Sequence, residues 1–279
     1  MTHEEAFLQD IVENRDDDTP RRIFGDWLMD HDDAVSQARG EFIHLQCDLA
    51  KHTIGAERPR ELLRRERELL WTHGKHWGGG LGRFGCVCWE YKRGFVEGVG
   101  MPALAFVAHA ATLLKMAPVR DLKVYDGAGQ MSALAKCADL AFIRSLDLEK
   151  NQLGDHDLGD LAKSPYFGRL TTLLLWNNHI ADIGIRALTK ADLPVLTRLD
   201  LSNNVIGNAG AVALAGSAML SRLRILDLTG NLIGDPGGVA LAQSSHTATL
   251  TWLDLTKNPI MASQPLLRER LAGRVQVLG

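Results

Sequence analysis

Apolar and polar positions follow one another in the second half of the chain with a spacing that recurs five times. Each block has an apolar residue, two free positions, Leu, one free position, Leu, two free positions and Asn. The blocks are Ile143, Leu146, Leu148 and Asn151; Leu170, Leu173, Leu175 and Asn178; Leu196, Leu199, Leu201 and Asn204; Leu223, Leu226, Leu228 and Asn231; and Leu250, Leu253, Leu255 and Asn258. Successive second leucines lie 27, 26, 27 and 27 residues apart. A unit of this length cannot bury its leucines alone, so the pattern predicts stacked repeats that share one core.

Each repeat is expected to contain a short strand, because its two closely spaced leucines would share one face of an extended segment. The Asn behind the strand turns inward, where its amide can satisfy backbone groups of its own turn and of the neighbouring repeat. This predicts a structural asparagine ladder made of Asn151, Asn178, Asn204, Asn231 and Asn258.

A helix is expected after each asparagine turn. In four repeats a residue of the helix-capping type follows four positions after the Asn: Asp155, Asp182, Asn208 and Asp235. Further leucines then recur on the side of this helix that is expected to face the core: Leu161, Leu188, Leu214 and Leu241. The repeat is therefore predicted to consist of a strand, an asparagine turn and a capped helix.

The first third of the chain shows helical patterns instead of repeats. Thr2 and Glu5 form a capping-box pair in front of a first helix. Thr19 as N-cap and Pro20 as the first helical residue are expected to begin a second helix. Two more helices are predicted over residues 35–51 and 59–71, which gives a small all-helical domain.

The segment between these two parts is expected to hold an irregular hairpin over residues 86–99 and a degraded repeat in which Gly127 takes the asparagine position. A last strand is expected at Val275 and Val277. The predicted domains are a helical domain over residues 1–77, a capping hairpin with degenerate repeats over residues 78–142, five regular repeats over residues 143–260 and a C-terminal cap over residues 261–279.

The run NxIGDxGxxALA, best seen in residues 204–215 and 231–242, resembles leucine-rich repeats of the ribonuclease-inhibitor type. The resemblance extends from about Arg93 to the C-terminus. It implies an α/β leucine-rich repeat solenoid, with parallel strands on the concave face and helices on the convex face.

Three N-terminal segments, residues 4–14, 16–31 and 39–51, resemble in order the bacterial repeat-companion domain. This family implies a short helical segment in front of repeats, a bacterial cytoplasmic origin and no catalytic residues. Gly25 departs from the family, which more often has Ala before the Asp-Trp pair.

Composition narrows the possible partners. The formal net charge of -3 provides no concentrated cationic footprint, so nucleic acid and membrane surfaces are not expected as partners. The first residues lack the cationic start and apolar core of a signal peptide. The four cysteines follow no disulfide spacing, and we interpret them as reduced thiols in the cytoplasm.

Four side chains have the residue types of a zinc site. His73, His76, Cys86 and Cys88 could supply two imidazoles and two thiolates to zinc. Their spacing is unusual, and buried cysteines often pack as small apolar residues, so no metal and no cofactor is predicted. The chain also shows no nucleophile elbow, no phosphate-binding Gly-Lys loop and no HExxH helix.

Free strand positions beside the inward leucines are where a partner would bind. One column of these positions reads Asp147, Leu174, Asp200, Asp227 and Asp254. The aspartates favour either a solvated face or contact with a basic partner. Leu174 with Trp176, and Ile225 with Trp252, could anchor a partner, or the tryptophans could fold back against the repeats.

We therefore predict a non-enzymatic protein-binding scaffold that is monomeric and whose protein partner has a basic patch. The predicted partner-binding residues are Leu174, Trp176, Asp200, Ile225, Asp227, Trp252 and Asp254. The alternative is a regulator of an enzyme, such as an activator of small GTPases, which rests on fold analogy alone.

Overall fold

The computed structural model describes residues 2–51 and 60–276. The chain divides into two units, which are described separately here. Unit 1 comprises Met1–Met101 and His109–Arg120, and unit 2 comprises Pro102–Ala108 and Asp121–Gly279. The predicted start of a helix at residue 59 and the strand residue Val277 lie outside the described residues.

Unit 1 joins four helices to one antiparallel hairpin, and the predicted capping box is present, since Thr2 and Glu5 exchange hydrogen bonds. The second helix begins with Thr19 and has Asp18 as its N-cap, so the prediction of Thr19 as N-cap was wrong by one residue. The elements are α1 (His3–Glu13), α2 (Thr19–Met29), α3 (Ala34–Lys51), α4 (Arg60–Trp77), the 3-10 helix η1 (Leu81–Phe84), β1 (Cys88–Lys92) and β2 (Phe95–Pro102).

Two glycines let α2 and α3 pack closely. A Cβ atom on Gly40 would lie 2.5 Å from the carbonyl oxygen of Gly25, so no larger residue fits there without a backbone shift. The hairpin approaches α3 in the same way. Its two turn residues, Arg93 and Gly94, have φ values of 50° and 84°, and a Cβ on Gly94 would lie 2.7 Å from the Cα of Ile43. Backbone contact therefore sets the spacing of these elements.

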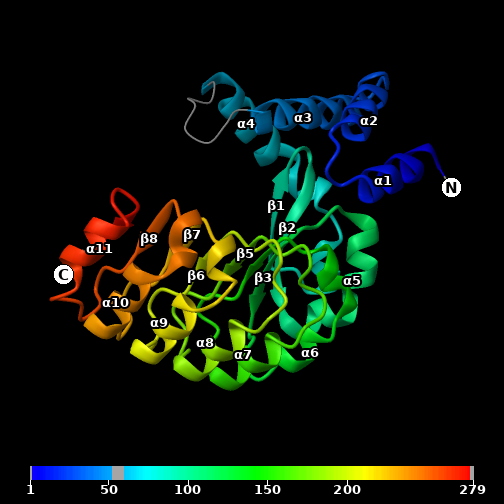
Figure 1. Cartoon of the computed structure of the whole chain (residues 1–279). Coiled ribbons are helices and arrows are strands. Elements are labelled where there is room, and N and C mark those ends of the chain that lie inside the picture. Colours follow the sequence, from blue (N-terminus) through cyan, green and yellow to red (C-terminus); the bar gives the residue numbers. More distant parts are fainter. Residues whose placement is uncertain (1, 52–59, 277–279) are drawn as a thin grey trace. The chain divides into compact units, whose positions relative to one another are not determined.

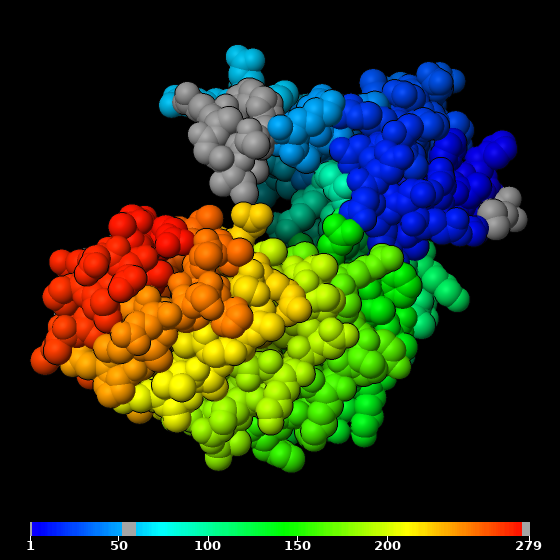
Figure 2. Space-filling model, in the orientation of Figure 1, coloured from blue at the N-terminus to red at the C-terminus, as the bar shows by residue number. Residues whose placement is uncertain are grey.

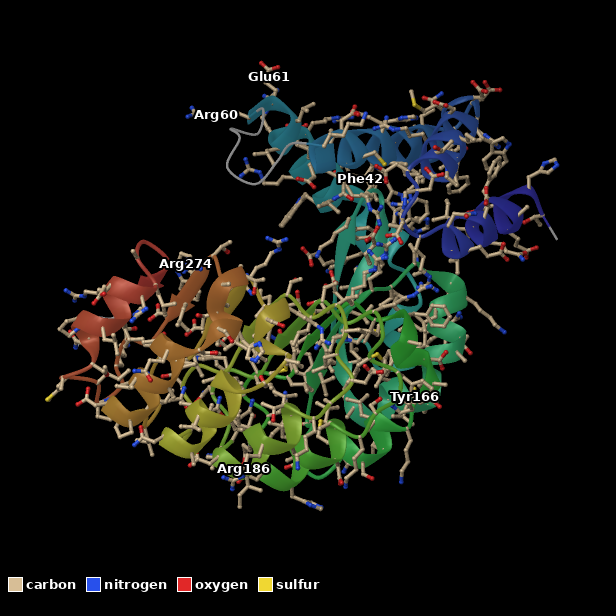
Figure 3. The ribbon with its side chains drawn as sticks, in the orientation of Figure 1. Phe42, Arg60, Glu61, Tyr166, Arg186 and Arg274 are labelled. Atoms are coloured by element: carbon tan, nitrogen blue, oxygen red, sulfur yellow. The ribbon has the colours of Figure 1, made fainter. Side chains whose placement is uncertain are left out.

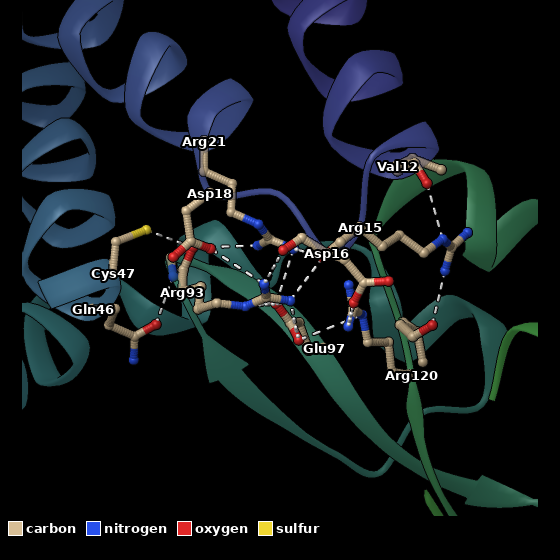
Figure 4. Close-up of polar contacts among 12 residues, drawn as sticks. Val12, Arg15, Asp16, Asp18, Arg21, Gln46, Cys47, Arg93, Glu97 and Arg120 are labelled. Atoms are coloured by element: carbon tan, nitrogen blue, oxygen red, sulfur yellow. Dashed lines mark hydrogen bonds and ion pairs between the residues drawn. The ribbon is translucent and has the colours of Figure 1, made fainter. Parts of the chain in front are cut away.

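A cluster of charged side chains connects the α1–α2 segment to the hairpin (Figure 4). Glu97 on β2 is 5% exposed and pairs with Arg21 at 2.9 Å and Arg93 at 2.8 Å. Arg93 also pairs with Asp18 at 3.2 Å, and Arg120 pairs with Asp16 at 2.5 Å. Burial raises the pKa of Glu97, and the surrounding arginines oppose that shift. The cluster pairs three arginines with three carboxylates, so each carboxylate compensates positive charge on an arginine.

Glu97→Gln removes the charge that compensates Arg21, whose side chain is fully buried. We expect the free energy of unfolding to fall by about 3 kcal/mol, because one partner of a buried pair is left uncompensated. Urea unfolding followed by circular dichroism measures the change. Glu90→Gln is the matched control, since Glu90 forms an exposed pair with Lys92, and its loss should stay below about 1 kcal/mol. Equal effects of the two variants would contradict this description of the cluster.

Unit 2 contains the repeats, with the strands in a row along one side and helices α6–α10 along the other (Figure 1). Strands β3 to β9 pair in chain order, and each pairing is parallel. Its elements are β3 (Asp121–Tyr125), α6 (Met131–Ala135), η2 (Ala138–Phe142), β4 (Ser145–Asp147), α7 (Asp155–Leu161), β5 (Thr172–Leu174), α8 (Asp182–Leu188), β6 (Arg198–Asp200), α9 (Asn208–Ala215), η3 (Leu220–Arg222), β7 (Ile225–Asp227), α10 (Asp235–Gln243), η4 (Ser245–Thr249), β8 (Trp252–Asp254), α11 (Gln264–Arg270) and β9 (Val275–Gln276). Helix α5 (Ala103–Met116) contributes residues to both units.

The space-filling view shows the repeats stacked in chain order, from green to orange (Figure 2). Their core consists of the block leucines, and Leu146, Leu173, Leu199, Leu226 and Leu253 each have no exposed surface. Each of these leucines occupies the middle of a three-residue strand, between two half-buried neighbours in four strands and between exposed Arg198 and half-buried Asp200 in β6. Only by stacking do these short strands acquire a continuous apolar core.

The ladder asparagines hydrogen-bond across the boundary between repeats. The Asn204 side chain accepts from the N–H of Ile180 at 3.0 Å and donates to the carbonyl of Leu175 at 3.0 Å, both in the preceding repeat. It also donates to Leu201 in its own repeat at 3.0 Å. Asn178, Asn231 and Asn258 have the same bonding pattern. Asn151 connects the first regular repeat to the degraded repeat, because its side chain accepts a hydrogen bond from the N–H of Gly127 at 2.7 Å.

The helix-capping residues begin their own helices, but their side chains do not cap those helices as the sequence predicts. Asp182 is the first residue of α8, and its Oδ1 accepts from the N–H groups of Gly207 and Gly210 in the next repeat, at 2.7 and 2.8 Å. Gly207 is the N-cap of α9, so Asp182 caps the following helix. Asp155 and Asn208 repeat this arrangement, and Asp235 accepts from the N–H groups of Met261 and Ser263 at the start of α11. The prediction missed this because a single repeat cannot show which helix a carboxylate reaches.

This second ladder explains a glycine of the repeat motif. A Cβ atom on Gly210 would lie 2.7 Å from the Oδ1 of Asp182 and 2.7 Å from the Cγ2 of Ile206. We expect Gly210→Ala to destabilise the protein by about 2 kcal/mol through overpacking, although Ala favours helices.

Gly159→Ala is the matched control, because Gly159 lies in α7 and its Cβ would meet nothing within 4 Å. This variant should raise the free energy of unfolding by up to about 1 kcal/mol. Both are measured by urea unfolding. If Gly210→Ala also stabilises the protein, the cross-repeat cap does not constrain that position.

Candidate partner-binding face

The strand residues on either side of each buried leucine form columns across the repeats. The register aligns Asp200 with Asp227 and Asp227 with Asp254. Leu174 lies in the same column, between Asp147 and Asp200. Ile225 pairs with Trp252 in a second column, which lies two residues before the first column on each strand. The sequence-predicted residues Leu174, Asp200, Ile225, Asp227, Trp252 and Asp254 therefore lie on one face of the strands, which we call the strand face, and Trp176 follows two residues after the end of β5.

The aspartates of the column also have a local structural role. Asp147, Asp200, Asp227 and Asp254 each accept a hydrogen bond from the backbone N–H two residues later, at 2.8 to 3.0 Å. One carboxylate oxygen thus holds the bend that follows the strand. This role differs from the predicted solvation or partner contact, and its sequence signal is the side chain–backbone bonding that Asp favours in turns.

A cation compensates one end of the acidic column. Lys123 on β3 aligns with Asp147, pairs with it at 2.9 Å and also bonds Glu149. The place of Lys123 in this column could have been predicted from the sequence, because it lies between the two apolar strand positions of the degraded repeat. Asp200, Asp227 and Asp254 are farther along the column, and within residues 2–51 and 60–276 none of them has an ion pair.

Charge and burial act together on Asp227. Burial raises the pKa of its carboxyl group, and Asp200 and Asp254 raise it further, against the hydrogen bonds from Thr229. Ionised aspartates in neighbouring positions repel one another. A partner that supplies positive charge here would relieve this repulsion.

The two tryptophans have different surroundings, although both are half-buried. The ammonium of Lys150 lies 4.4 Å from the ring centroid of Trp176, which is a cation–π contact within the repeats. Lys150 precedes a ladder asparagine and has a φ of 57°, and the residues at the same place in the other repeats also have positive φ. Trp176 is thus partly covered by its own repeats, whereas Trp252 lies next to Ile225 in the register.

The four metal candidates do not come together. Among residues 2–51 and 60–276, no group of three or more His, Cys, Asp or Glu side chains is positioned to hold a metal ion. His73 stacks on Trp77, with 5.1 Å between ring centroids, and Cys86 is buried beside Met101.

In the same range of residues, no helix is both long and apolar enough to cross a membrane.

A family model described as "Leucine rich repeat" matches residues 168–233 of the chain. This match supports leucine-rich repeats in this part of the protein. An internalin C2 from Listeria monocytogenes is a similar solved structure, with 26% sequence identity and a TM-score of 0.38, over 58% of this chain and 63% of that one. The chain therefore spans less than two thirds of the length of that structure. No curated protein sequence matches the chain.

Asp227→Asn separates charge from turn formation, because the amide oxygen can still accept from Thr229. A carboxyl whose pKa is raised on folding stabilises the folded state below its ordinary pKa of 3.8, and this stabilisation is lost as the pH rises through the folded pKa. We therefore expect Asp227→Asn to melt at a higher temperature than wild type at pH 7. The difference should shrink as the pH falls toward 3.8, and a lower melting temperature at pH 7 would contradict the prediction.

Proposed function

We propose that the strand face binds a protein partner through an apolar contact beside an acidic one. The observation that carries the proposal is the register of β7 and β8, which sets Ile225 beside Trp252 and Asp227 beside Asp254. Residues two apart on a strand point to the same side, so the apolar pair and the acidic pair adjoin on one surface. A basic residue next to an apolar one on the partner would match both pairs.

The surface divides into two parts with different chemistry. Leu174 and Trp176 form one apolar part, and Lys150 covers the ring of Trp176. A partner would have to bind around that ammonium or displace it. Ile225 and Trp252 form the other part, next to acids that Lys123 does not reach among the described contacts. We place the main apolar contact with the partner at Ile225 and Trp252, and Asp200 lies at the edge of that contact.

The proposal includes a non-enzymatic role and a curved solenoid of the ribonuclease-inhibitor type that presents this face as its concave side. It also includes a helical repeat-companion domain in the N-terminal part. The repeat family match supports protein binding as the class of function. No contact among the described residues favours the alternative of a small-GTPase activator over a scaffold.

Capture on the immobilised full chain, followed by mass spectrometry, would identify the partner. The purified partner is then titrated against variants by calorimetry. Trp252→Ala should weaken binding by about thirtyfold, as expected when a central aromatic anchor is removed. Asp200→Asn and Asp254→Asn should lower the association rate and its salt dependence, because the amide keeps the turn and loses the charge.

Val212→Ala is the matched control, because Val212 is an apolar residue on helix α9 with 51% of its surface exposed. Arg186, which Figure 3 shows on the helix side of unit 2, offers a charged control as Arg186→Ala. Circular dichroism confirms that each variant is folded. If the controls weaken binding and Trp252→Ala does not, the partner binds elsewhere.

A further inference from the structure

Unit 1 contains a cavity of about 340 Å³ that the repeats do not share. Leu8, Phe24, Leu28, Phe95 and Val96 contribute apolar walls. The volume lies at the small end of the range for ligand pockets, which are commonly apolar with a few polar groups that fix orientation.

Arg39 on α3 reaches this cavity from among aromatic rings. Its guanidinium carbon lies 5.0 Å from the ring centroid of Trp77 and 5.1 Å from that of Phe95. Phe42 and Tyr91 also lie within 6 Å, and Figure 3 shows Phe42 on α3 above the hairpin. The rings hold the guanidinium plane in place, yet they accept none of its N–H groups in a conventional hydrogen bond.

Two buried N–H donors at this cavity have no acceptor. The Nη1 of Arg39 and the Nε1 of Trp77 are both buried without a hydrogen-bond partner among the described residues. Both side chains line the cavity. Leaving a buried donor unpaired is costly, more so for a charged one, and native structures nearly always satisfy such groups. These two donors belong to side chains in contact with each other at one cavity, so a single acceptor with two oxygens would satisfy both.

The charge of the cavity limits that acceptor. Burial lowers the pKa of Arg39 to about 10, so its guanidinium remains charged at neutral pH. Glu4 also lines the cavity and interacts electrostatically with Arg39. One arginine, partly offset by one carboxylate, suits a ligand with a single negative charge better than one with two.

We propose that this cavity binds a small monocarboxylate with an apolar tail, whose two oxygens accept from Arg39 and Trp77 while the tail packs against the apolar walls. The carboxylate satisfies both donors and compensates the guanidinium. The tail replaces water against Leu8, Phe24 and Leu28. The site belongs to unit 1 and does not depend on protein binding by the repeats.

Hexanoate is the probe and hexanamide is its neutral counterpart. The full chain, labelled with nitrogen-15 at its six tryptophans, is titrated with each while the indole N–H signals are recorded. Hexanoate should shift one indole signal in a saturable manner, and that signal should be absent from Trp77→Phe. Affinity should rise about fourfold for each CH₂ between acetate and hexanoate, as apolar burial requires. Hexanamide should leave the signal nearly unchanged.

Two variants with opposite expected effects test the charge. Arg39→Met keeps an apolar stem in the cavity and should weaken hexanoate binding at least about tenfold. Glu4→Gln removes the competing carboxylate from an exposed position and should tighten binding roughly threefold. If Arg39→Met does not fold, the opposite shift in Glu4→Gln still tests the site.

Three results would overturn the proposal. Absence of any indole shift at millimolar hexanoate would mean that water alone satisfies the two donors. Equal binding of hexanoate and hexanamide would show an apolar cavity without a carboxylate site. Tighter binding of phenyl phosphate than of phenylacetate would show that the cavity selects a dianion.

Discussion

Each repeat of unit 2 must turn sharply between a strand of three residues and a helix, and the turn places backbone N–H and C=O groups inside the protein. The asparagine amides satisfy those groups, and most of their bonds reach the preceding repeat. The leucine core depends on these bonds, because unpaired polar groups in the turns would oppose burial of the neighbouring leucines. The aspartate ladder at the helix starts adds a second row of bonds between repeats. Stacking is thus stabilised by polar bonds as well as by apolar contact.

The strand face follows from this division of roles. The leucines pack in the core and the asparagines form the turns, so among the strand residues only those beside the leucines are free to contact a partner. Even there, an aspartate uses one oxygen for its own turn, which leaves the other for a partner. The apolar pair of Ile225 and Trp252 has no comparable role in the bonds of the turn. This difference in local function is the reason to place the anchor there.

The period, the strand positions and the inward asparagines could be predicted because each depends on residues within one repeat or on simple stacking. The direction of the aspartate caps could not, since Asp182 reaches a helix 25 residues later. The positive φ before each asparagine was signalled by Asn or Gly in three repeats, but Lys150 and Lys257 gave no such signal in the other two. In unit 1 the helices were recognisable from capping and periodicity. The cavity was not, because Arg39, Trp77 and Phe95 meet only through tertiary packing.

The central claim is that a protein partner contacts the strand face at β7 and β8. Hydroxyl-radical footprinting of the captured complex tests it most directly, because half-buried Trp252 and exposed Met261 and Trp71 oxidise readily and can be compared in one experiment. The account predicts that the partner protects Trp252 strongly and leaves Trp71 on α4 as reactive as in the free protein. Protection of Trp71, or of the helices α8 to α10, with Trp252 unchanged would contradict it.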